Sequence, residues 1–194
     1  MDSKTTPKCI LVVAGGLGVG KGTATTYMKE TYGATTLEFS GALRSVLARL
    51  YLPIDRTHMV SLSKGLRELF GNDILARVMA EDARTAETNL LVLDGARRLG
   101  DISHIKDDPR FRLAYIDADP AKRFERIVKR SQNEGDDKKT YDDFLKDLQA
   151  ETELSIAALL PLAHVTWMNN GTQAEFFAQI DAFMKQEGIA PKNL

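Results

Sequence analysis

The chain has 194 residues, the length of one domain with room for a small insertion. Its 26 Lys and Arg nearly balance its 27 Asp and Glu, giving a net charge of −1, and 43% of its residues are hydrophobic. This composition excludes an intrinsically disordered chain and lacks the basic excess of a non-specific nucleic-acid binder. No apolar run approaches the roughly 18 residues that span a bilayer, and no signal-peptide pattern is visible. We therefore expect a cytoplasmic protein without a membrane or nucleic-acid partner.

Short apolar runs alternate with longer helical patterns, which is typical of a parallel sheet whose crossover helices cover both faces. We expect five strands, at residues 9–14, 35–39, 90–94, 112–117 and 165–168. Helices are expected at residues 22–32, 42–50, 56–70, 73–85, 101–106, 121–131, 141–160 and 173–187. A single cysteine, Cys9, excludes an intramolecular disulfide and predicts a buried thiol, because it lies in an apolar run. Residues 1–194 are therefore predicted to form one α/β domain.

A glycine-rich turn joins the first strand to the first helix. It reads Gly15-Gly16-Leu17-Gly18-Val19-Gly20-Lys21-Gly22-Thr23, which matches G-x-x-x-x-G-K in the strand–loop–helix context of a phosphate-binding Walker A loop. The glycines let backbone N–H groups turn toward phosphates, the helix N-terminus adds partial positive charge, and Lys21 reaches the terminal phosphates. We expect this loop to bind ATP within a three-layer P-loop NTPase fold; the alternative is a turn that binds nothing.

Gly22 stands where most such loops place a magnesium-ligating Ser or Thr, and the hydroxyl comes one residue later, at Thr23. In this respect the loop resembles that of adenylate kinase and its nucleoside monophosphate kinase relatives, which also reads Gly-Lys-Gly-Thr. In that family magnesium is held mainly through phosphates and water. The resemblance therefore implies that Thr23 contacts a phosphate or a magnesium-bound water.

The segment from Phe39 to Arg44 follows the second predicted strand. Ser40 is a reasonable helix N-cap. A buried stripe is predicted that leaves Arg44 free to reach a cleft, and it consists of Leu43, Val46, Leu47 and Leu50. The alternative is a solvated surface arginine. The segment is similar to the S/T-G-x-x-L-R segment of adenylate-kinase-like proteins, which implies that Ser40 and Arg44 bind the acceptor, Arg44 through its phosphate.

By the same resemblance, residues 40–86 form a helical acceptor-binding segment. Arg67 and Arg77 either contribute further acceptor contacts in it or lie on the surface.

Asp94 ends the third predicted strand and is followed by Gly95-Ala96-Arg97-Arg98. A carboxylate at the carboxyl end of a strand beside a phosphate loop can orient magnesium through water, whereas a turn or cap role is the simpler alternative. The segment resembles the D-G-x-x-R segment of adenylate kinase, whose arginine holds the acceptor phosphate; this selects Arg98. Another branch of the superfamily reads D-G-x-R, which selects Arg97. The sequence leaves both open.

Asp119-Pro120 opens a helix that carries Arg123, Arg126 and Arg130 along one face. Such a face can be solvated or paired with acidic neighbours. Residues 125–130 are similar to the D-R-I-V-G-R segment entering the adenylate kinase lid, which implies that Arg126 stacks on the donor base and Arg130 contacts donor phosphates. Cations there would stabilise the charge that spreads over the transferring oxygens. A short lid at residues 131–143 lacks the arginine of short-lid kinases, for which Arg123 or Arg97 is a substitute candidate.

Residues 136–144, residues 151–154 and the closing segment Met168-Asn169-Asn170-Gly171-Thr172 resemble the dephospho-CoA-kinase-like and archaeal adenylate-kinase-like branch. There an asparagine, at Asn170 here, lies near the donor base. The resemblance implies a kinase that uses ATP and Mg²⁺ to phosphorylate a small phosphorylated substrate, a nucleoside or deoxynucleoside monophosphate first of all. The alternatives are a dephospho-CoA or phosphomevalonate kinase and a nucleotide-binding regulatory ATPase or pseudo-kinase. The acceptor and the oligomeric state stay open.

Overall fold

The computed structural model describes residues 6–130 and 140–192, apart from the side chains of Arg130 and Thr152. Within these ranges five parallel strands form a sheet in the order β2-β3-β1-β4-β5. The strands are β1 (Cys9–Ala14), β2 (Thr35–Glu38), β3 (Leu90–Asp94), β4 (Phe111–Asp117) and β5 (Val165–Met168). Each lies within one residue of its predicted bounds, and the predicted α/β P-loop fold is confirmed. No helix in these ranges is long and apolar enough to cross a membrane.

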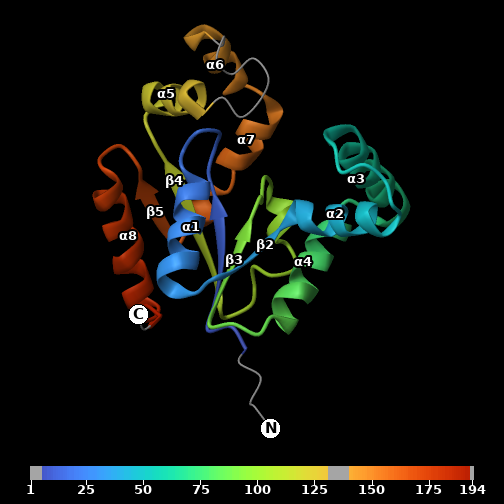
Figure 1. The fold of residues 1–194 in the computed structure, drawn as a ribbon, viewed down its shortest axis with the longest axis horizontal. Helices are drawn as coiled ribbons and strands as arrows, with labels where there is room; N and C mark the ends of the chain where they lie inside the picture. The colour runs from blue at the N-terminus through green and yellow to red at the C-terminus, as the bar shows by residue number, and fades with distance from the viewer. Residues whose placement is uncertain (1–5, 131–139, 193–194) are drawn as a thin grey trace.

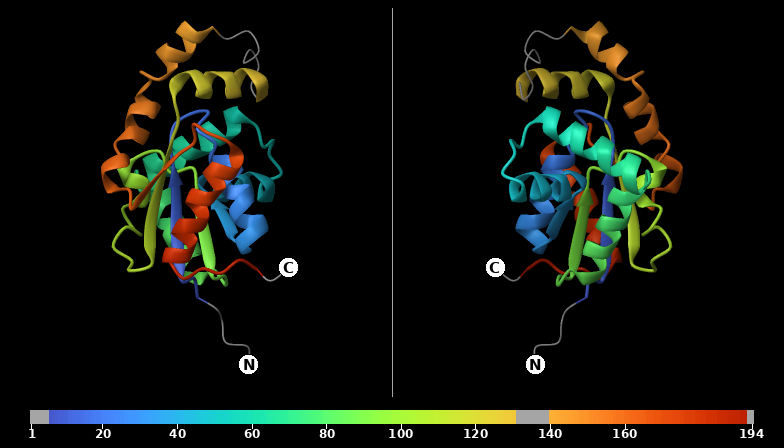
Figure 2. Two further views of the ribbon diagram at one scale, coloured as in Figure 1. Left: turned by 90° about the vertical axis from the view of Figure 1, so that its left-hand side faces the viewer. Right: turned by 90° about the vertical axis from the view of Figure 1, so that its right-hand side faces the viewer.

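Helices cover both faces of the sheet (Figures 1 and 2). They are α1 (Lys21–Tyr32), α2 (Phe39–Arg49), α3 (Arg56–Phe70), α4 (Ile74–Thr85), α5 (Pro120–Arg130), α6 (Tyr141–Asp147), α7 (Glu151–Ala157) and α8 (Gln173–Gln186), with 3₁₀ turns η1 (Leu99–Ile102) and η3 (Leu160–Leu162). Successive side chains of a strand point to opposite faces. Leu11 of β1 therefore packs with α1 and α8, whereas Val12 packs with α4 and η1. The core thus has two buried clusters separated by the sheet.

The single helix predicted at residues 141–160 is wrong, because the chain forms α6 and α7 with a bend between them. Phe144 of α6 is fully buried beside Phe124 of α5, with ring centroids 5.9 Å apart. Ile156 and Leu159 instead enter the buried cluster on the α4 face of the sheet. The bend allows the two apolar groups to reach these separate places.

The helix predicted at residues 101–106 is also wrong, since the chain forms η1 followed by turns. Asp101 explains the earlier start. Its carboxylate accepts the backbone N–H of Arg97 at 2.9 Å and Nε of Arg98 at 3.2 Å. These bonds draw the turn back against the end of β3.

The start of α2 and its apolar stripe differ from prediction. The helix begins at Phe39, so Ser40 is not its N-cap; the Ser40 hydroxyl donates to Glu38 Oε2 at 3.0 Å. Leu43 and Leu47 are buried as expected, whereas Val46 and Leu50 are exposed. Figure 1 shows the reason: α2 and α3 form an arm beside the sheet rather than on its face, so only part of the stripe meets a neighbour.

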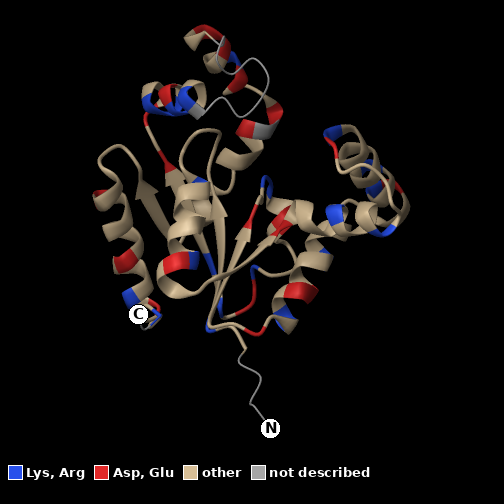
Figure 3. Ribbon diagram, viewed as in Figure 1, with Lys and Arg blue, Asp and Glu red and all other residues tan. Residues whose placement is uncertain are grey.

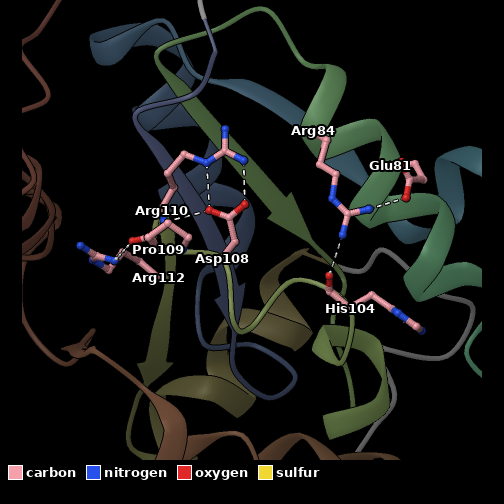
Figure 4. A network of polar contacts seen from close by, with 7 residues as sticks. All are labelled: Glu81, Arg84, His104, Asp108, Pro109, Arg110 and Arg112. Carbon is pink, nitrogen blue, oxygen red and sulfur yellow. Dashed lines mark hydrogen bonds and ion pairs between the residues drawn. The ribbon is translucent and has the colours of Figure 1, made fainter.

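At the amino end of β4, a group of arginines has a structural role (Figure 4). Arg110 donates to Asp108 from Nε at 2.9 Å and from Nη2 at 2.6 Å. Arg84, at the end of α4, pairs with Glu81 and donates to the carbonyl of His104 at 3.4 Å. These bonds tie α4 and the η1–β4 connection together at the end of the sheet opposite the glycine-rich loop.

Candidate nucleotide-binding site

The glycine-rich loop lies between β1 and α1, at the carboxyl end of the sheet. Gly18 and Gly20 have φ angles of 77° and 104°, which side-chain-bearing residues rarely adopt. Space is restricted as well, because a Cβ on Gly20 would lie 2.4 Å from Nδ2 of Asn169. Gly15 also has a positive φ, of 145°, and a Cβ on Gly15 or Gly18 would lie 2.4 Å or 2.7 Å from the carbonyl oxygen of Ile116 or Arg123. Three of the predicted glycines are therefore required both by the backbone conformation and by a close neighbour.

A cavity of about 770 Å³ opens beside this loop. Its lining combines residues 17–23 with Asp94 from the end of β3, Arg126 and Ile127 from α5, and side chains of α1 and α8. The volume lies within the range of about 300–1,000 Å³ that is typical of small-molecule sites. The structure thus brings together the loop, Asp94 and Arg126, three features that the sequence singled out separately.

Lys21 begins α1 and Asp94 ends β3, and the charge of each affects the pKa of the other. The Lys21 ammonium donates to the carbonyls of Gly15 at 2.7 Å and Gly16 at 2.9 Å. Burial lowers the pKa of Lys21, and the carboxylate of Asp94 acts in the opposite direction. Burial raises the pKa of Asp94, against the influence of Lys21. Both groups are therefore partly desolvated, a state typical of functional sites.

Asn169 connects the loop to Arg126, and the sequence analysis did not identify it. Its Nδ2 donates to the carbonyl of Val19 at 2.8 Å, and its own carbonyl accepts from Nη2 of Arg126 at 2.7 Å. Asn170, which the resemblance selected, instead bonds Asp119 at 2.8 and 3.0 Å. The sequence did contain a signal that could have identified Asn169: it is a polar residue directly after β5, at the edge of the sheet where the loop lies.

The structure distinguishes the two adjacent arginines after β3. Arg98 bonds Asp101, whereas the positive charge of Arg97 lowers the pKa of both Lys21 and Asp94. Arg98 lies on the side of Arg67, whose pKa is lowered by burial and then by Arg98. Arg97 is thus the arginine nearer the loop, and Arg98 the one nearer the α2–α3 arm.

On the arm, Arg67 donates from Nη1 to Ser63 at 2.7 Å, while its buried Nε finds no partner among the described residues. Arg44 is 57% exposed and lies 4.0 Å from Glu38. Figure 3 shows Lys and Arg positions along α5 on one side of the loop and along α2 and α3 on the other. The arginines predicted for the acceptor therefore lie across the sheet edge from those predicted for the donor.

Arg123 differs from the free lid arginine that the sequence offered as one possibility. Its Nε donates to the carbonyl of Leu17 at 2.7 Å, and its Nη2 donates to Glu153 at 2.8 Å. Glu153 lies in a segment that carries the resemblance, but no role was predicted for it. It is 136 residues from Leu17 in the chain, so no local motif indicates their contact. The side chain of Arg130 and lid residues 131–139 lie outside the described residues.

Magnesium is implied by the fold. Throughout residues 6–130 and 140–192, no three or more His, Cys, Asp or Glu side chains gather into a site that could hold a metal alone. Thr23 and Asp94 nevertheless line the same cavity and offer oxygen donors, the type that Mg²⁺ prefers. This set fits an ion that arrives with phosphates and takes few protein ligands.

The sequence model of the AAA domain family matches residues 14–144, which is more than half of the chain. The protein belongs to this family. Among curated proteins, this AAA domain chain is 29% identical to a UPF0200 protein of Staphylothermus marinus over 168 residues, 87% of each sequence. It is 26% identical to a UPF0200 protein of Saccharolobus solfataricus over 170 residues, covering 86% of the chain and 87% of the relative.

Solved structures share the fold of this AAA domain protein. Shikimate kinase from Acinetobacter baumannii superposes with a TM-score of 0.52 at 15% identity, covering 95% of each chain. A gluconokinase from Sinorhizobium meliloti gives 0.57 at 13% identity, covering 93% of this chain and 94% of that one. The likeness to P-loop kinases that the sequence indicated is confirmed at the level of the fold.

Proposed function

We propose that the protein is an ATP-dependent small-molecule kinase that transfers the γ-phosphoryl group to a small phosphorylated acceptor, first of all a nucleoside or deoxynucleoside monophosphate. One observation carries the proposal. The cavity beside the loop contains two cations, Lys21 and Arg126, that the described residues hold through carbonyl and amide oxygens rather than carboxylates. Nη1 of Arg126 is buried without a partner among these residues. ATP would satisfy such groups, with its phosphates at Lys21 and its base against the Arg126 guanidinium.

We assign the donor roles to residues that line the cavity. Backbone N–H groups of the loop and the first turn of α1 would hold the donor phosphates. Lys21 would leave its carbonyl partners for the terminal phosphates, and Arg126 would lie toward the donor base. Thr23 and Asp94 would hold Mg²⁺, which would neutralise phosphate charge. Arg130 is proposed from sequence alone as a further donor-phosphate contact.

The acceptor roles fall to the arm, and we propose residues 40–86 as its acceptor-binding helices. Arg44, Arg67 and Arg98 would bind the anionic group of the acceptor, with Ser40 beside them. Arg97 would lie between acceptor and donor, since its charge already acts on Lys21 and Asp94. The acceptor oxygen would form a bond to the γ-phosphorus while the bond to the β–γ bridging oxygen breaks. The products are ADP and the phosphorylated acceptor.

The test is ADP formation by the purified protein with Mg-ATP against a panel of acceptors. The panel contains nucleoside and deoxynucleoside monophosphates, dephospho-CoA and phosphomevalonate, together with shikimate and gluconate because of the structural neighbours. We expect acceleration by a monophosphate class, lost in Lys21→Ala. Acceleration by another acceptor would correct the substrate. Slow turnover that no acceptor accelerates would favour a regulatory ATPase, and ATP binding without turnover a pseudo-kinase.

A further inference from the structure

The backbone of Leu17 is held from outside the loop by two oppositely charged side chains. Glu153 of α7 accepts the Leu17 N–H through Oε1 at 3.1 Å and Oε2 at 3.2 Å. Arg123 of α5 donates from Nε to the Leu17 carbonyl at 2.7 Å and from Nη2 to Glu153 at 2.8 Å. The backbone N–H and C=O of Leu17 are thus both bound by side chains that also form an ion pair with each other. We call these three residues the Leu17 clasp.

The clasp is enclosed and sterically tight. The side chains of Arg123 and Glu153 are only 11% and 17% exposed. The Arg123 guanidinium also lies over the ring of Phe144, 5.7 Å from its centroid, so α6 supports it from the far side. A Cβ on Gly16 would fall 2.3 Å from Nη2 of Arg123 and 2.4 Å from Oε2 of Glu153. The loop and the two charged groups are therefore in direct contact.

The two charged side chains of the clasp are not part of the lining of the phosphate cavity. Leu17 to Thr23 line that cavity together with Asp94 and Arg126, whereas neither Arg123 nor Glu153 is among the described residues that line it. Glu153 therefore does not occupy the space in which phosphates would lie. It binds the backbone N–H of Leu17, and Arg123 pairs with it there.

We propose that Arg123 and Glu153 are positioning residues that hold the loop in its phosphate-binding conformation before the nucleotide arrives. The inference rests on the proposed function and deepens it, because it adds two residues to the donor site that do not touch the donor. A loop of glycines has high conformational freedom when unbound. Holding Leu17 by three hydrogen bonds removes part of this freedom in advance, so less of it is lost on binding. Arg123 is committed to this task and is not the substitute for a lid arginine.

The first test needs no nucleotide. Amide hydrogen exchange is measured in the peptide that spans residues 15–19, in the wild type and in Glu153→Ala, with Glu151→Ala as the matched control on an exposed position of the same helix. We expect exchange of the Leu17 amide to become roughly tenfold faster in Glu153→Ala and to stay unchanged in the control. Unchanged exchange in Glu153→Ala would overturn the proposal.

The second test measures donor affinity. We expect the Kd for Mg-ATP and for pyrophosphate to rise about tenfold in Arg123→Ala and Glu153→Ala, while the KM of the acceptor changes less than twofold. Lys122→Ala is the control on α5. The Arg123→Ala variant should bind Mg-ATP and pyrophosphate more weakly than the Arg123→Ala/Glu153→Gln double variant, since the single substitution leaves an unpaired carboxylate beside the loop. Circular dichroism checks folding, and Glu153→Gln is a milder second variant.

The outcomes separate the two proposals. A wild type that binds neither Mg-ATP nor pyrophosphate would overturn the proposed function, and the positioning role with it. A wild type that binds, together with variants that exchange faster but keep their affinity, would overturn the positioning role alone. Faster exchange with a matched loss of donor affinity supports it.

Discussion

The proposed donor side and the proposed acceptor side of the carboxyl edge of the sheet are built differently. On the donor side, Leu17 is held by Arg123 and Glu153, and Val19 is held by Asn169. On the acceptor side, Arg44 is mostly exposed and the turn after α2 carries Tyr51, 87% exposed. The loop is thus fixed by side chains from distant parts of the chain, whereas the arm presents cations and apolar groups to solvent.

This difference indicates when each half of the site acquires its final geometry. We infer that the proposed donor half is preorganised, so its backbone donors would need little rearrangement to receive phosphates. The proposed acceptor half has an exposed Arg44 and a partly buried Arg67, so we expect its arginines to adjust around an anion. The substitutions below compare the two halves, from the largest expected effect to the smallest.

Lys21→Ala should have the largest effect, because it removes the cation at the centre of the donor half. We expect kcat/KM for phosphoryl transfer to fall by about 10²–10³-fold, the usual cost of losing a preorganised charge-stabilising group. Steady-state kinetics measure the effect. Lys29→Ala, on an exposed position of the same helix, serves as control and should change little. A loss of less than tenfold in Lys21→Ala would contradict the donor assignment.

Arg97→Ala and Arg98→Ala test where the donor half ends and the acceptor half begins. Arg97 acts on Lys21 and Asp94, so its removal should lower kcat about 10²-fold. Arg98 lies toward Arg67, so its removal should raise the acceptor KM roughly tenfold and leave kcat nearly unchanged. Full kinetics with both substrates varied distinguish the two. The reverse pattern would exchange the two roles.

Gly16→Ala and Gly41→Ala compare the packing of the two halves. A Cβ on Gly16 meets Arg123 and Glu153, so overpacking should lower the free energy of unfolding by about 1–3 kcal/mol. Gly41, within α2, has no described atom within 4 Å of its Cβ position, and alanine there should stabilise the helix by about 0.5–1 kcal/mol. Urea unfolding measures both. Equal tolerance would show that the loop is not tightly held.

Cys9 is the first residue of β1, the strand that leads into the glycine-rich loop. Its reactivity tests whether this strand is buried along its whole length. Burial raises the pKa of its thiol from 9.0 to about 12. Between these values the unfolded chain loses a proton that the folded chain keeps, so this group lowers stability as the pH rises from 9 toward 12. A thiol reagent at pH 8 should not modify the native protein and should modify it in urea. Ala190→Cys places a thiol at an exposed position and serves as the reactive control. Rapid labelling of Cys9 in the native protein would show that the start of β1 is accessible to solvent.

The features that could be predicted from the sequence are formed by residues close together in the chain. The glycine-rich loop and Lys21 are adjacent residues whose spacing alone carries the chemistry, and Asp94 ends a strongly apolar run. Position at a strand end was sufficient to bring them to one edge of the sheet. The same reasoning explains why all five described strands were identified.

What escaped prediction depends on contacts between distant residues. Glu153 meets Leu17 across 136 residues and Asn169 meets Val19 across 150, so neither pairing is visible in a local pattern. The break between α6 and α7 contains no glycine or proline from which it could be predicted. It results from the position at which Phe144 is buried. Leu50 fits a helical stripe by spacing, yet the arm gives it no surface to cover.

Trp167, the one tryptophan in the sequence, lies in β5 with a side chain only 1% exposed. Its ring packs edge-on against Phe183, with centroids 5.8 Å apart, and its Nε1 has no hydrogen-bond partner in the described part of the chain. An indole in so apolar a setting emits at short wavelength. Two residues later, Asn169 bonds both the glycine-rich loop and Arg126. The protein therefore carries an intrinsic fluorophore in the buried cluster that also contains Val19 of the glycine-rich loop, and we expect its emission to report ligand titrations without an added label.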